Sequence, residues 1–345
     1  MPWRELSHDD IDVLLHGHIA FQLLGSAHEL GLFDHLSAHP GATARETAAA
    51  TGLAEGPFAV LLGGLPALSL VTDDGGRLRN APAVERTLVT GRETNRTALL
   101  GMHRHLVYPG VGDLLASLQR STNVGLLHFP GAGDTLYTRL ADRPRLEKVL
   151  HDGLHALSKA AFDGLIRSAV LTGNEHVLDI GGGDGSNALA LARAYGSLTV
   201  TIVDLPSVLR ITEANVTEAG LRDRVRWHAA DFLTEPLPEG ADTVLMAHVL
   251  PIFPPRTNRR LLAKAHAALP SGGRVLISNT MQDDTEDGPV MPMLFSAYFL
   301  SRASGSGCYY PWAHHEQWLR ETGFTEVRRL GGMPYAHGLC VATKP

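Results

Sequence analysis

Glycine residues crowd the segment VLDIGGGDGS, residues 177–186, where the backbone could approach a small ligand closely. An apolar run leads into Asp179, and Gly181 and Gly183 follow in a G-x-G-x-G pattern. A dinucleotide site usually carries its third glycine where this chain has Ser186. The spacing therefore favours a ligand without a pyrophosphate, whose ammonium group Asp179 could attract directly or through water.

Two more acidic residues stand where later apolar runs end. Asp204 lies in the run TVTIVDL, residues 199–205, at a point where a carboxylate can accept hydrogen bonds from both hydroxyls of a ribose. Because NAD sites share that carboxylate, Asp204 predicts a nucleoside but not its identity. Asp231 and Phe232 follow the next run and offer a hydrogen-bond acceptor and a flat apolar ring for an adenine. The alternative is that Asp231 caps a helix and Phe232 packs in the core.

The second half of the chain has the pattern of a sheet that would position these residues. From about residue 166, apolar runs of strand length alternate with helical patterns. The alternation predicts an α/β fold with a doubly wound parallel sheet, in which ligands bind at the carboxyl ends of the strands. The predicted strands are 176–180, 199–205, 225–232, 242–250 and 273–280, and an antiparallel hairpin on the sheet edge is predicted over 324–330 and 338–344.

Residues 10 to about 165 have a mostly helical pattern. Thr43 and Glu46 have the spacing of a capping box, an apolar helix is predicted over 55–71, and a short hairpin follows. This order of helix, turn, helix and hairpin is typical of winged-helix proteins, which raises a DNA-binding regulator as an alternative function. Residues 54–71 contain no Lys or Arg, however, and Glu55 is their only charged residue. The apolar helix therefore predicts burial in a core or in a subunit interface.

Length and charge argue against several classes of protein. A chain of 345 residues favours two domains, and a formal net charge of -6 argues against nucleic acid or an anionic membrane as the main partner. The N-terminal segment MPWRELSHDD is polar and acidic, unlike a signal or transit peptide. The two cysteines, Cys308 and Cys340, imply no disulfide framework, so we expect a cytoplasmic protein without a membrane partner.

The order of the motifs VLDIGGGDG, VDLP, ADF, HVL, PSGGRVLI and ETGF resembles that of the class I S-adenosylmethionine-dependent small-molecule O-methyltransferases. That family includes plant phenolic enzymes and bacterial enzymes that tailor natural products. The resemblance covers nearly the whole chain and implies a winged-helix-like dimerisation domain over 1–100, linking helices over 101–165 and a Rossmann-like catalytic domain over 166–345. It also implies S-adenosyl-L-methionine as the cofactor and a homodimer formed through the N-terminal domain.

The resemblance further implies roles for individual residues. It places Gly181 and Gly183 against the methionine part of the cofactor and Asp204 on its ribose. It places Ser158 near the cofactor carboxylate and Leu154 in the wall of the pocket. The complete set implied to bind the cofactor is Ser158, Asp179, Gly181, Gly183, Asp204, Leu205, Asp231, Phe232 and His248.

The segment HVLPIF, residues 248–253, departs from the family pattern. Pro251 stands where the family carries its catalytic histidine, and a proline has neither a titratable group nor a backbone donor. Asn279 stands where a glutamate often orients that histidine. The paired loss predicts a reaction that does not use this base. Keto-acid-methylating relatives bind iron through a His-Asp pair at the positions of Pro251 and Ile252, so no metal site is predicted.

Three chemistries remain open after this loss. An acceptor that is already nucleophilic, such as an amine, a phenolate or an electron-rich aromatic carbon, could react with little help beyond positioning. Alternatively, another base has replaced the histidine, and the best candidates are Tyr309, Tyr310 and His314, although capping or packing would also explain these residues. Finally, the cofactor could be retained for a step other than methyl transfer.

The segment PVMPMLFSAYFLSRASG, residues 289–305, is rich in Met and aromatic residues. A plain core helix is one interpretation of it. By resemblance the helix faces the acceptor, with Met291, Phe295, Tyr298 and Phe299 as candidate substrate contacts. The sequence thus predicts a methyltransferase that acts at carbon, nitrogen or oxygen of a small aromatic natural-product intermediate. A non-methylating enzyme of the same fold and a winged-helix regulator are the alternatives.

Overall fold

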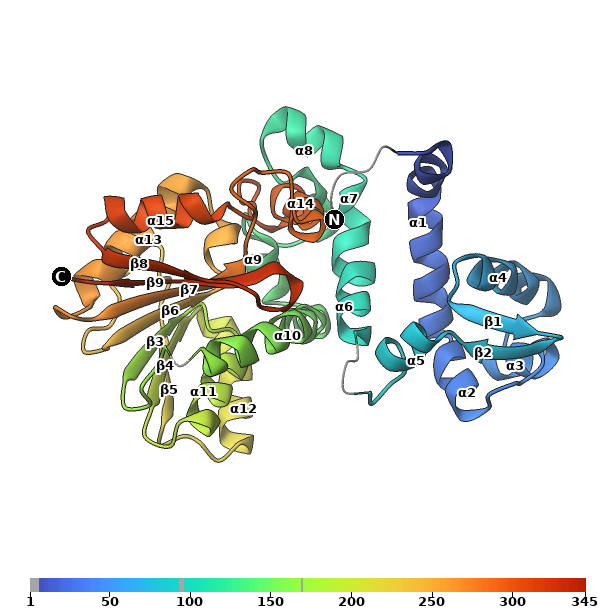
Figure 1. Ribbon diagram of the computed structural model, residues 1–345, viewed down its shortest axis with the longest axis horizontal. Helices are drawn as coiled ribbons and strands as arrows, with labels where there is room; N and C mark the ends of the chain where they lie inside the picture. The colour runs from blue at the N-terminus through green and yellow to red at the C-terminus, as the bar shows by residue number, and fades with distance from the viewer. Residues whose placement is uncertain (1–5, 93–95, 169) are drawn as a thin grey trace. The chain divides into compact units, whose positions relative to one another are not determined.

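The computed structural model describes residues 6–92, 96–168 and 170–345, apart from the side chain of residue 160. The chain forms two compact units, Met1–Leu106 and Val107–Pro345 (Figure 1). Residues 1–5, the first half of the N-terminal segment MPWRELSHDD that is unlike a targeting peptide, lie outside the described residues. No single helix in the described ranges is long and apolar enough to cross a membrane, although α3 (Ala44–Thr51) and α4 (Glu55–Ala67) pass that test as a pair bent by 112°.

The N-terminal unit packs helices around a two-stranded hairpin. The predicted capping box is confirmed, because the Thr43 side chain accepts from the Glu46 N–H and the Glu46 side chain accepts from the Thr43 N–H. The helix predicted to reach residue 71 ends at Ala67, because Ser69 takes a left-handed backbone with φ of 56°. The elements are α1 (His8–Glu29), α2 (Leu32–Ala38), α3 (Ala44–Thr51), α4 (Glu55–Ala67), β1 (Val71–Asp74), β2 (Arg77–Asn80), α5 (Pro82–Thr87) and α6 (Thr97–Met102), with a π-helical turn at His103–Val107.

The C-terminal unit contains the sheet, in the strand order β5-β4-β3-β6-β7-β9-β8. Strands β5, β4, β3, β6 and β7 pair in parallel, whereas β9 pairs antiparallel with both β7 and β8. The doubly wound sheet with an antiparallel edge hairpin is therefore confirmed. The strands are β3 (His176–Ile180), β4 (Thr199–Asp204), β5 (Val225–Ala229), β6 (Thr243–Ala247), β7 (Arg274–Thr280), β8 (Thr325–Leu330) and β9 (His337–Thr343).

Helices cover both faces of this sheet, with α10, α11 and α12 on one face and α13 and α15 on the other (Figure 1). The helices that cover the sheet are α10 (Pro144–Arg167), α11 (Ser186–Ala194), α12 (Pro206–Glu218), α13 (Pro255–Ala268) and α15 (Trp312–Glu321). The remaining helices are α7 (Tyr108–Val111), α8 (Leu114–Arg120), α9 (Leu136–Leu140) and α14 (Val290–Tyr298), with short helical turns at Val124–His128, Leu250–Ile252, Phe299–Ala303 and Pro334–Ala336.

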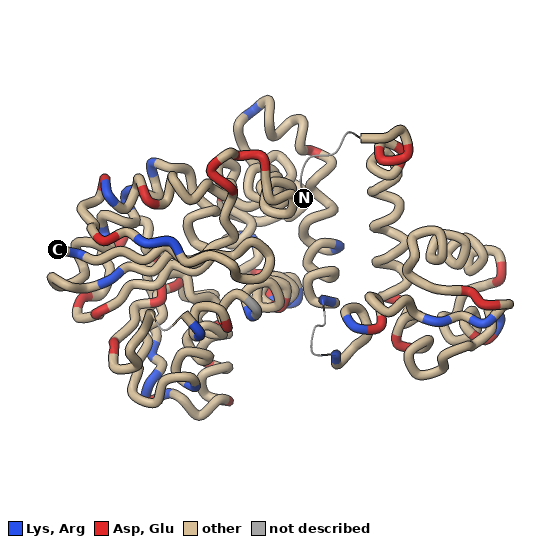
Figure 2. The backbone as a smooth tube through the Cα atoms, viewed as in Figure 1, with Lys and Arg blue, Asp and Glu red and all other residues tan. Residues whose placement is uncertain are grey.

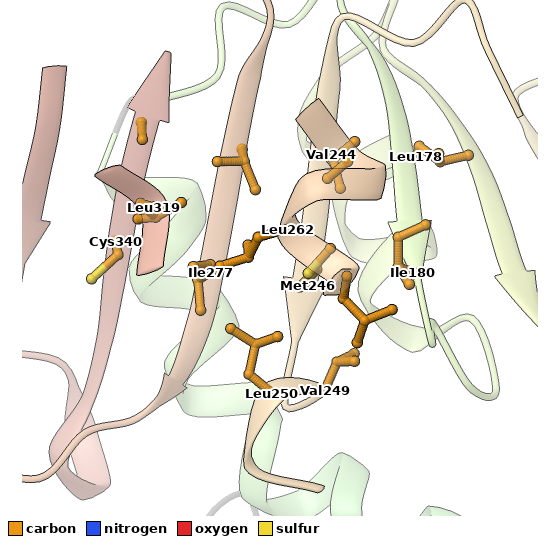
Figure 3. Packing of buried hydrophobic residues seen from close by; sticks show 14 of the residues in the cluster. Leu178, Ile180, Val244, Met246, Val249, Leu250, Leu262, Ile277, Leu319 and Cys340 are labelled. Carbon is orange, nitrogen blue, oxygen red and sulfur yellow. The ribbon is translucent and has the colours of Figure 1, made fainter. Parts of the chain in front are cut away.

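Alternating side chains of the central strands supply the two halves of the core. Leu178 and Ile180 of β3 and Met246 of β6 pack with α13 and α15 (Figure 3). Val177 of β3 and Leu245 of β6 point the opposite way and pack with α10, α11 and α12. Because both faces are covered, the central strands are mostly apolar, and polar side chains gather toward the strand ends.

Two strands are shorter than predicted, and the reasons lie at their carboxyl ends. Strand β6 ends at Ala247 because the next residue, His248, has a left-handed backbone with φ of 59°. Strand β5 ends at Ala229, because Asp231 accepts hydrogen bonds from the Leu233 N–H and the Thr234 hydroxyl and thereby forms a turn. Both turns point side chains toward the same end of the sheet.

Candidate active site

A cavity of about 310 Å³ opens in the C-terminal unit at the carboxyl ends of the parallel strands. The loops after β3, β4, β5 and β6 line one side of it, and α9, α10, α14 and the turn that follows α14 line the other. The lining residues that matter for the chemistry are Tyr137, Glu147, His151, Leu154, His155, Ser158, Gly181, Gly182, Gly183, Asp184, Asp204, Leu205, Asp231, Phe232, His248, Ile252, Phe253, Phe295, Tyr298, Phe299 and Tyr309. Most of the residues expected at the cofactor therefore do meet at one cavity.

The glycine loop after β3 has a conformation that side chains would obstruct. Gly181 and Gly183 have φ of 67° and 60°, in the left-handed region that favours glycine. A Cβ at Gly181 would lie 2.9 Å from Val249 Cγ2, and one at Gly182 would lie 2.7 Å from Asp179 Oδ2. The loop thus presents bare backbone to the cavity, as a tightly held ligand requires.

Asp179 lies beneath this loop and does not face the cavity. Its side chain is fully buried, and both carboxylate oxygens lack a hydrogen-bond partner among the described residues. Burial, together with the nearby Asp204 and Asp184, raises the pKa of Asp179 to about 8. The group is therefore mostly protonated at neutral pH, which corrects the expectation that it attracts an ammonium directly.

Asp204 ends β4 and is held firmly by backbone donors. Its Oδ2 accepts from the Gly183 N–H at 2.9 Å, and its Oδ1 accepts from the Leu205 N–H at 2.7 Å. Burial raises the pKa of Asp204, while these two hydrogen bonds oppose the rise. The carboxylate therefore joins the glycine loop to β4 and keeps lone pairs available at the cavity.

Asp231 and Phe232 line the cavity and also have structural roles, although Asp231 caps a turn rather than the helix that the alternative interpretation required. Asp231 caps the turn after β5 and still lines the cavity. Phe232 lines the cavity and also packs edge-on against Phe253, with ring centroids 6.2 Å apart. A capping role and a place in the cavity wall are thus compatible for these residues.

One face of α10 forms a wall of the cavity that sequence analysis found only in part. Ser158 and Leu154 line the cavity as expected, but Glu147 and His151 line it as well. Glu147 is 5% exposed, and burial raises its pKa. The i, i+4 spacing of Glu147 and His151, continued by Leu154 and Ser158, was the available signal.

The β6 end of the site combines a strained histidine with an apolar turn. His248 lines the cavity with φ of 59°, and its ring packs edge-on against the buried His337 with centroids 4.9 Å apart. Burial lowers the pKa of His248 to about 3, so its imidazole is neutral. Pro251 is buried in the helical turn Leu250–Ile252, and Asn279 is fully buried, with no hydrogen-bond partner for its amide in the described structure.

The predicted acceptor contacts divide between the cavity and the surface. Phe295, Tyr298 and Phe299 line the cavity, and the rings of Phe295 and Tyr298 are stacked with centroids 5.0 Å apart. Met291 is 38% exposed and does not line the cavity, which corrects its place among the contacts. Its position one helical turn before Phe295 was misleading, because only the later turns of α14 reach the cavity. Tyr137 of α9 joins this aromatic wall and had not been predicted.

Only one of the three proposed replacement bases reaches the cavity. Tyr309 lines it, whereas the Tyr310 hydroxyl donates to the Phe253 carbonyl at 2.7 Å. The His314 ring stacks on Trp318 with centroids 5.8 Å apart, on the side of α15 that packs into the core. The positions of Tyr310 and His314 therefore correct their candidacy as bases.

The cavity also has a pronounced charge asymmetry. Its described lining includes the carboxyl groups of Glu147, Asp184, Asp204 and Asp231, and no Lys or Arg. A ligand with a fixed positive charge, such as a sulfonium, complements such a lining better than a phosphate does. In the described residues, no group of three or more His, Cys, Asp and Glu side chains is arranged to hold a metal ion.

Residues 113–325 match the O-methyltransferase domain family. The chain belongs to this family. It is 37% identical over 336 residues to an L-tyrosine C(3)-methyltransferase of Streptomyces lavendulae, covering 96% of this chain and 91% of that one. It is 34% identical to a 3-hydroxy-5-methyl-1-naphthoate 3-O-methyltransferase of Streptomyces sahachiroi, covering 94% of this chain and 91% of that one.

Solved structures agree with this assignment. The apo S-adenosylmethionine-dependent methyltransferase SibL is 38% identical and has a TM-score of 0.82, with 98% of this chain and 100% of that chain covered. Human N-acetylserotonin methyltransferase in complex with its cofactor has a TM-score of 0.86 at 22% identity, covers 100% of this chain and 99% of its own, and shows the shared fold. The chain is therefore an S-adenosylmethionine-dependent methyltransferase. The non-methylating enzyme and the DNA-binding regulator gain no support, and α4 carries no Lys or Arg that could face a nucleic acid (Figure 2).

The glycine loop and the carboxylates fit this cofactor. The glycines of the loop have no Cβ atoms, so their backbone can approach a ligand closely. Asp204 accepts from the Gly183 N–H beside them and keeps lone pairs for the hydroxyl groups of a ribose. S-adenosylmethionine supplies an electrophilic methyl group on a positively charged sulfur. The acidic lining suits that charge.

Proposed function

We propose that this enzyme methylates a ring carbon of a small phenolic acceptor, with L-tyrosine as the first compound to test. The observation that carries the proposal is Pro251, which is buried at the β6 end of the site and cannot accept a proton. Ile252 and Phe253, which follow it, line the cavity, and their hydrocarbon side chains have no group that could accept a proton. The relative that modifies carbon 3 of L-tyrosine, aligned over 96% of this chain, supports this choice of acceptor.

Carbon methylation makes a modest demand on the protein. The carbon ortho to a phenolic hydroxyl is already nucleophilic because the oxygen donates electron density into the ring. As the new carbon–carbon bond forms, the bond between the cofactor sulfur and its methyl group breaks and leaves S-adenosylhomocysteine. The ring carbon then loses its own proton to water, and the hydroxyl is retained. Positioning therefore supplies much of the rate, and the aromatic wall of Phe295, Tyr298 and Phe299 can hold a flat ring in place.

We assign the cofactor contacts by the same reasoning. Gly181 and Gly183 lie against the methionine part, with Ser158 near its carboxylate. Asp204 and Leu205 hold the ribose. Asp231 and Phe232 would hold the adenine, and the neutral His248 would lie beside the cofactor. The support for this assignment is that all eight residues line one cavity, seven of them at the strand ends and Ser158 on α10.

Isotopic labelling distinguishes carbon transfer from oxygen or nitrogen transfer. The enzyme is incubated with S-adenosylmethionine and L-tyrosine that carries deuterium at ring positions 3 and 5. Carbon methylation replaces one deuterium with the methyl group, whereas methylation of the hydroxyl or the amine keeps both. A methylated product with both deuterium atoms would refute carbon transfer, and a panel of other phenols, indoles and amino acids extends the test if L-tyrosine is inert.

We also propose that the N-terminal unit, whose helices and hairpin have the winged-helix order, forms a homodimer. Several large apolar side chains of α1 are exposed, among them Val13 at 70% and Leu14 at 68%. An apolar surface of this kind is typical of a protein interface. The unpaired thiols of Cys308 and Cys340 support a reducing cytoplasm as the location.

A further inference from the structure

Lys264 of α13 reaches the loop that follows β5. Its Nζ donates to the Phe232 carbonyl oxygen at 2.6 Å and also to the Glu235 carbonyl oxygen. No backbone N–H donates to either of these carbonyls within the residues that the structure describes. The lysine therefore supplies hydrogen bonds that the backbone of the loop does not supply for itself.

The loop that Lys264 holds carries three side chains of the cavity wall. Asp231, Phe232 and Leu233 line the cavity. The Asp231 carboxylate shapes the loop from within, because it accepts from the Leu233 N–H and the Thr234 hydroxyl, both at 2.9 Å. Lys264 does not belong to the described lining of the cavity, so it acts on a ligand only through the loop.

The position of β5 in the sheet explains why this loop needs support from a helix. Strand β5 is an edge strand, and its partner in the described sheet is β4 alone. Helix α13, in contrast, is anchored in the core through Leu261, Leu262 and Ala265, each at most 1% exposed (Figure 3). The two hydrogen bonds from Lys264 thus tie a loop at the sheet edge to a helix packed in the core.

An ammonium group suits this position. It has three N–H donors and no acceptor, so one lysine can serve two carbonyls at once. Burial lowers the pKa of Lys264, and the nearby Asp231 carboxylate opposes that fall. Because the group has lost part of its water shell, the two carbonyls replace hydrogen bonds that water would otherwise supply.

We infer that Lys264 is a positioning residue, which fixes the loop 231–235 against α13 and thereby prearranges the adenine end of the cofactor pocket. The inference rests on the proposed function, in that Asp231 and Phe232 are assigned to the adenine. A loop already held in its bound conformation loses less conformational freedom when the ligand binds, so the ligand binds more tightly. Lys264 therefore acts on cofactor affinity and on recognition of the adenine, and not on the chemical step.

Lys344 provides a matched control at the carboxyl end of the same helix. Its Nζ donates to the carbonyl oxygens of His266 at 2.7 Å and Leu269 at 2.6 Å, so it also serves two backbone carbonyls. Both lysines are half-buried, and Lys344 likewise lies outside the described lining of the cavity. Methionine at either position keeps an aliphatic chain and removes the donors, so the two variants differ in which segment loses its support.

Binding of S-adenosylhomocysteine tests the inference without a methyl acceptor. In titration calorimetry, Lys264→Met should raise the dissociation constant about tenfold, which corresponds to about 1.4 kcal/mol. Lys344→Met should bind the ligand like wild type, although urea unfolding should show a loss of stability in both variants. Wild-type affinity in Lys264→Met, or an equal loss of affinity in Lys344→Met, would refute a positioning role.

Recognition of the adenine amine separates positioning from general stabilisation. S-inosylhomocysteine carries an oxygen in place of that amine and cannot donate to Asp231 in the same way. Wild type should prefer S-adenosylhomocysteine about tenfold, the value expected for one hydrogen bond, and Lys344→Met should keep this preference. Lys264→Met should show a smaller preference, because Asp231 is no longer held in place, and an undiminished preference would overturn the inference.

Hydrogen exchange of the ligand-free enzyme tests the support of the loop by itself. Lys264→Met should increase deuterium uptake over residues 230–237, and Lys344→Met should not. Unchanged uptake there in Lys264→Met would contradict the inference whatever the loop binds. Equal binding of the two ligands by wild type would instead reject the adenine contacts of the proposed function, and the exchange measurement would still decide whether Lys264 holds the loop.

Discussion

Replacing Gly181 with alanine should separate the steric role of the glycine loop from its conformational role. Gly181 and Gly220 have the same φ of 67°, so alanine costs about 1–2 kcal/mol of backbone strain at either position. At Gly220, which follows α12, the new Cβ would have nothing within 4 Å. At Gly181 it would lie 2.9 Å from Val249 Cγ2 and 3.7 Å from Phe232 Cε1.

The extra crowding predicts different results for the two variants. Gly220→Ala should lower the free energy of unfolding by about 1–2 kcal/mol through strain alone and bind S-adenosylmethionine like wild type. In Gly181→Ala, overpacking against Val249 should lower the free energy of unfolding by roughly a further 1–3 kcal/mol. Val249 and Phe232 both line the cavity, so a shift of these side chains changes the shape of the binding site. The dissociation constant of Gly181→Ala for the cofactor should therefore rise at least about tenfold, which corresponds to about 1.4 kcal/mol.

Urea unfolding measures the free energy of unfolding, and titration calorimetry with S-adenosylmethionine measures the dissociation constant for the cofactor. The comparison with Gly220→Ala removes the contribution of strain. Wild-type cofactor affinity in Gly181→Ala, or an equal loss of affinity in Gly220→Ala, would show that the loop does not hold the cofactor in the way the geometry indicates.

Three further predictions concern other parts of the molecule. The pKa of Asp179 is raised in the folded state to about 8 from an ordinary value of 3.8, so the folded protein holds this proton more tightly than the unfolded chain does. The free energy of unfolding should therefore fall as the pH rises from about 4 to 8. Asp179→Asn should flatten that dependence in urea unfolding. Two residues of α14 should differ in acceptor kinetics and in urea unfolding. Phe295→Ala should raise KM for the acceptor and lower the free energy of unfolding by about 3–5 kcal/mol, whereas Met291→Ala should change neither by much. Equal effects of the two variants would contradict the conclusion that Phe295 lines the cavity and Met291 does not. Serine in place of both Val13 and Leu14 should convert the dimer to a monomer in light scattering, while His18→Ser, an exposed polar change on the same helix, should not; a wild-type monomer would refute the dimer directly.

Local signals were sufficient for the elements of this fold. The alternation of apolar runs and helical patterns predicted every strand of the large sheet, because a doubly wound sheet buries both faces of its central strands. The order of strand ends then placed the glycine loop, Asp204 and Asp231 at one edge. The precise ends were less predictable, since β6 stops where His248 takes a left-handed conformation that no residue pattern announces.

The sequence by itself determined the α/β architecture and the meeting of the glycine loop, Asp204 and Asp231 at one end of the sheet, because both depend on local spacing and on the fixed geometry of parallel strands. Only the tertiary structure decided which side chains face the cavity. Asp179 and Met291 do not line it, whereas Glu147 and His151 of α10 do. The pairing of Thr280 with His337, 57 residues apart, was likewise invisible in the sequence, because a cross-strand contact depends on register and packing rather than on neighbouring residues.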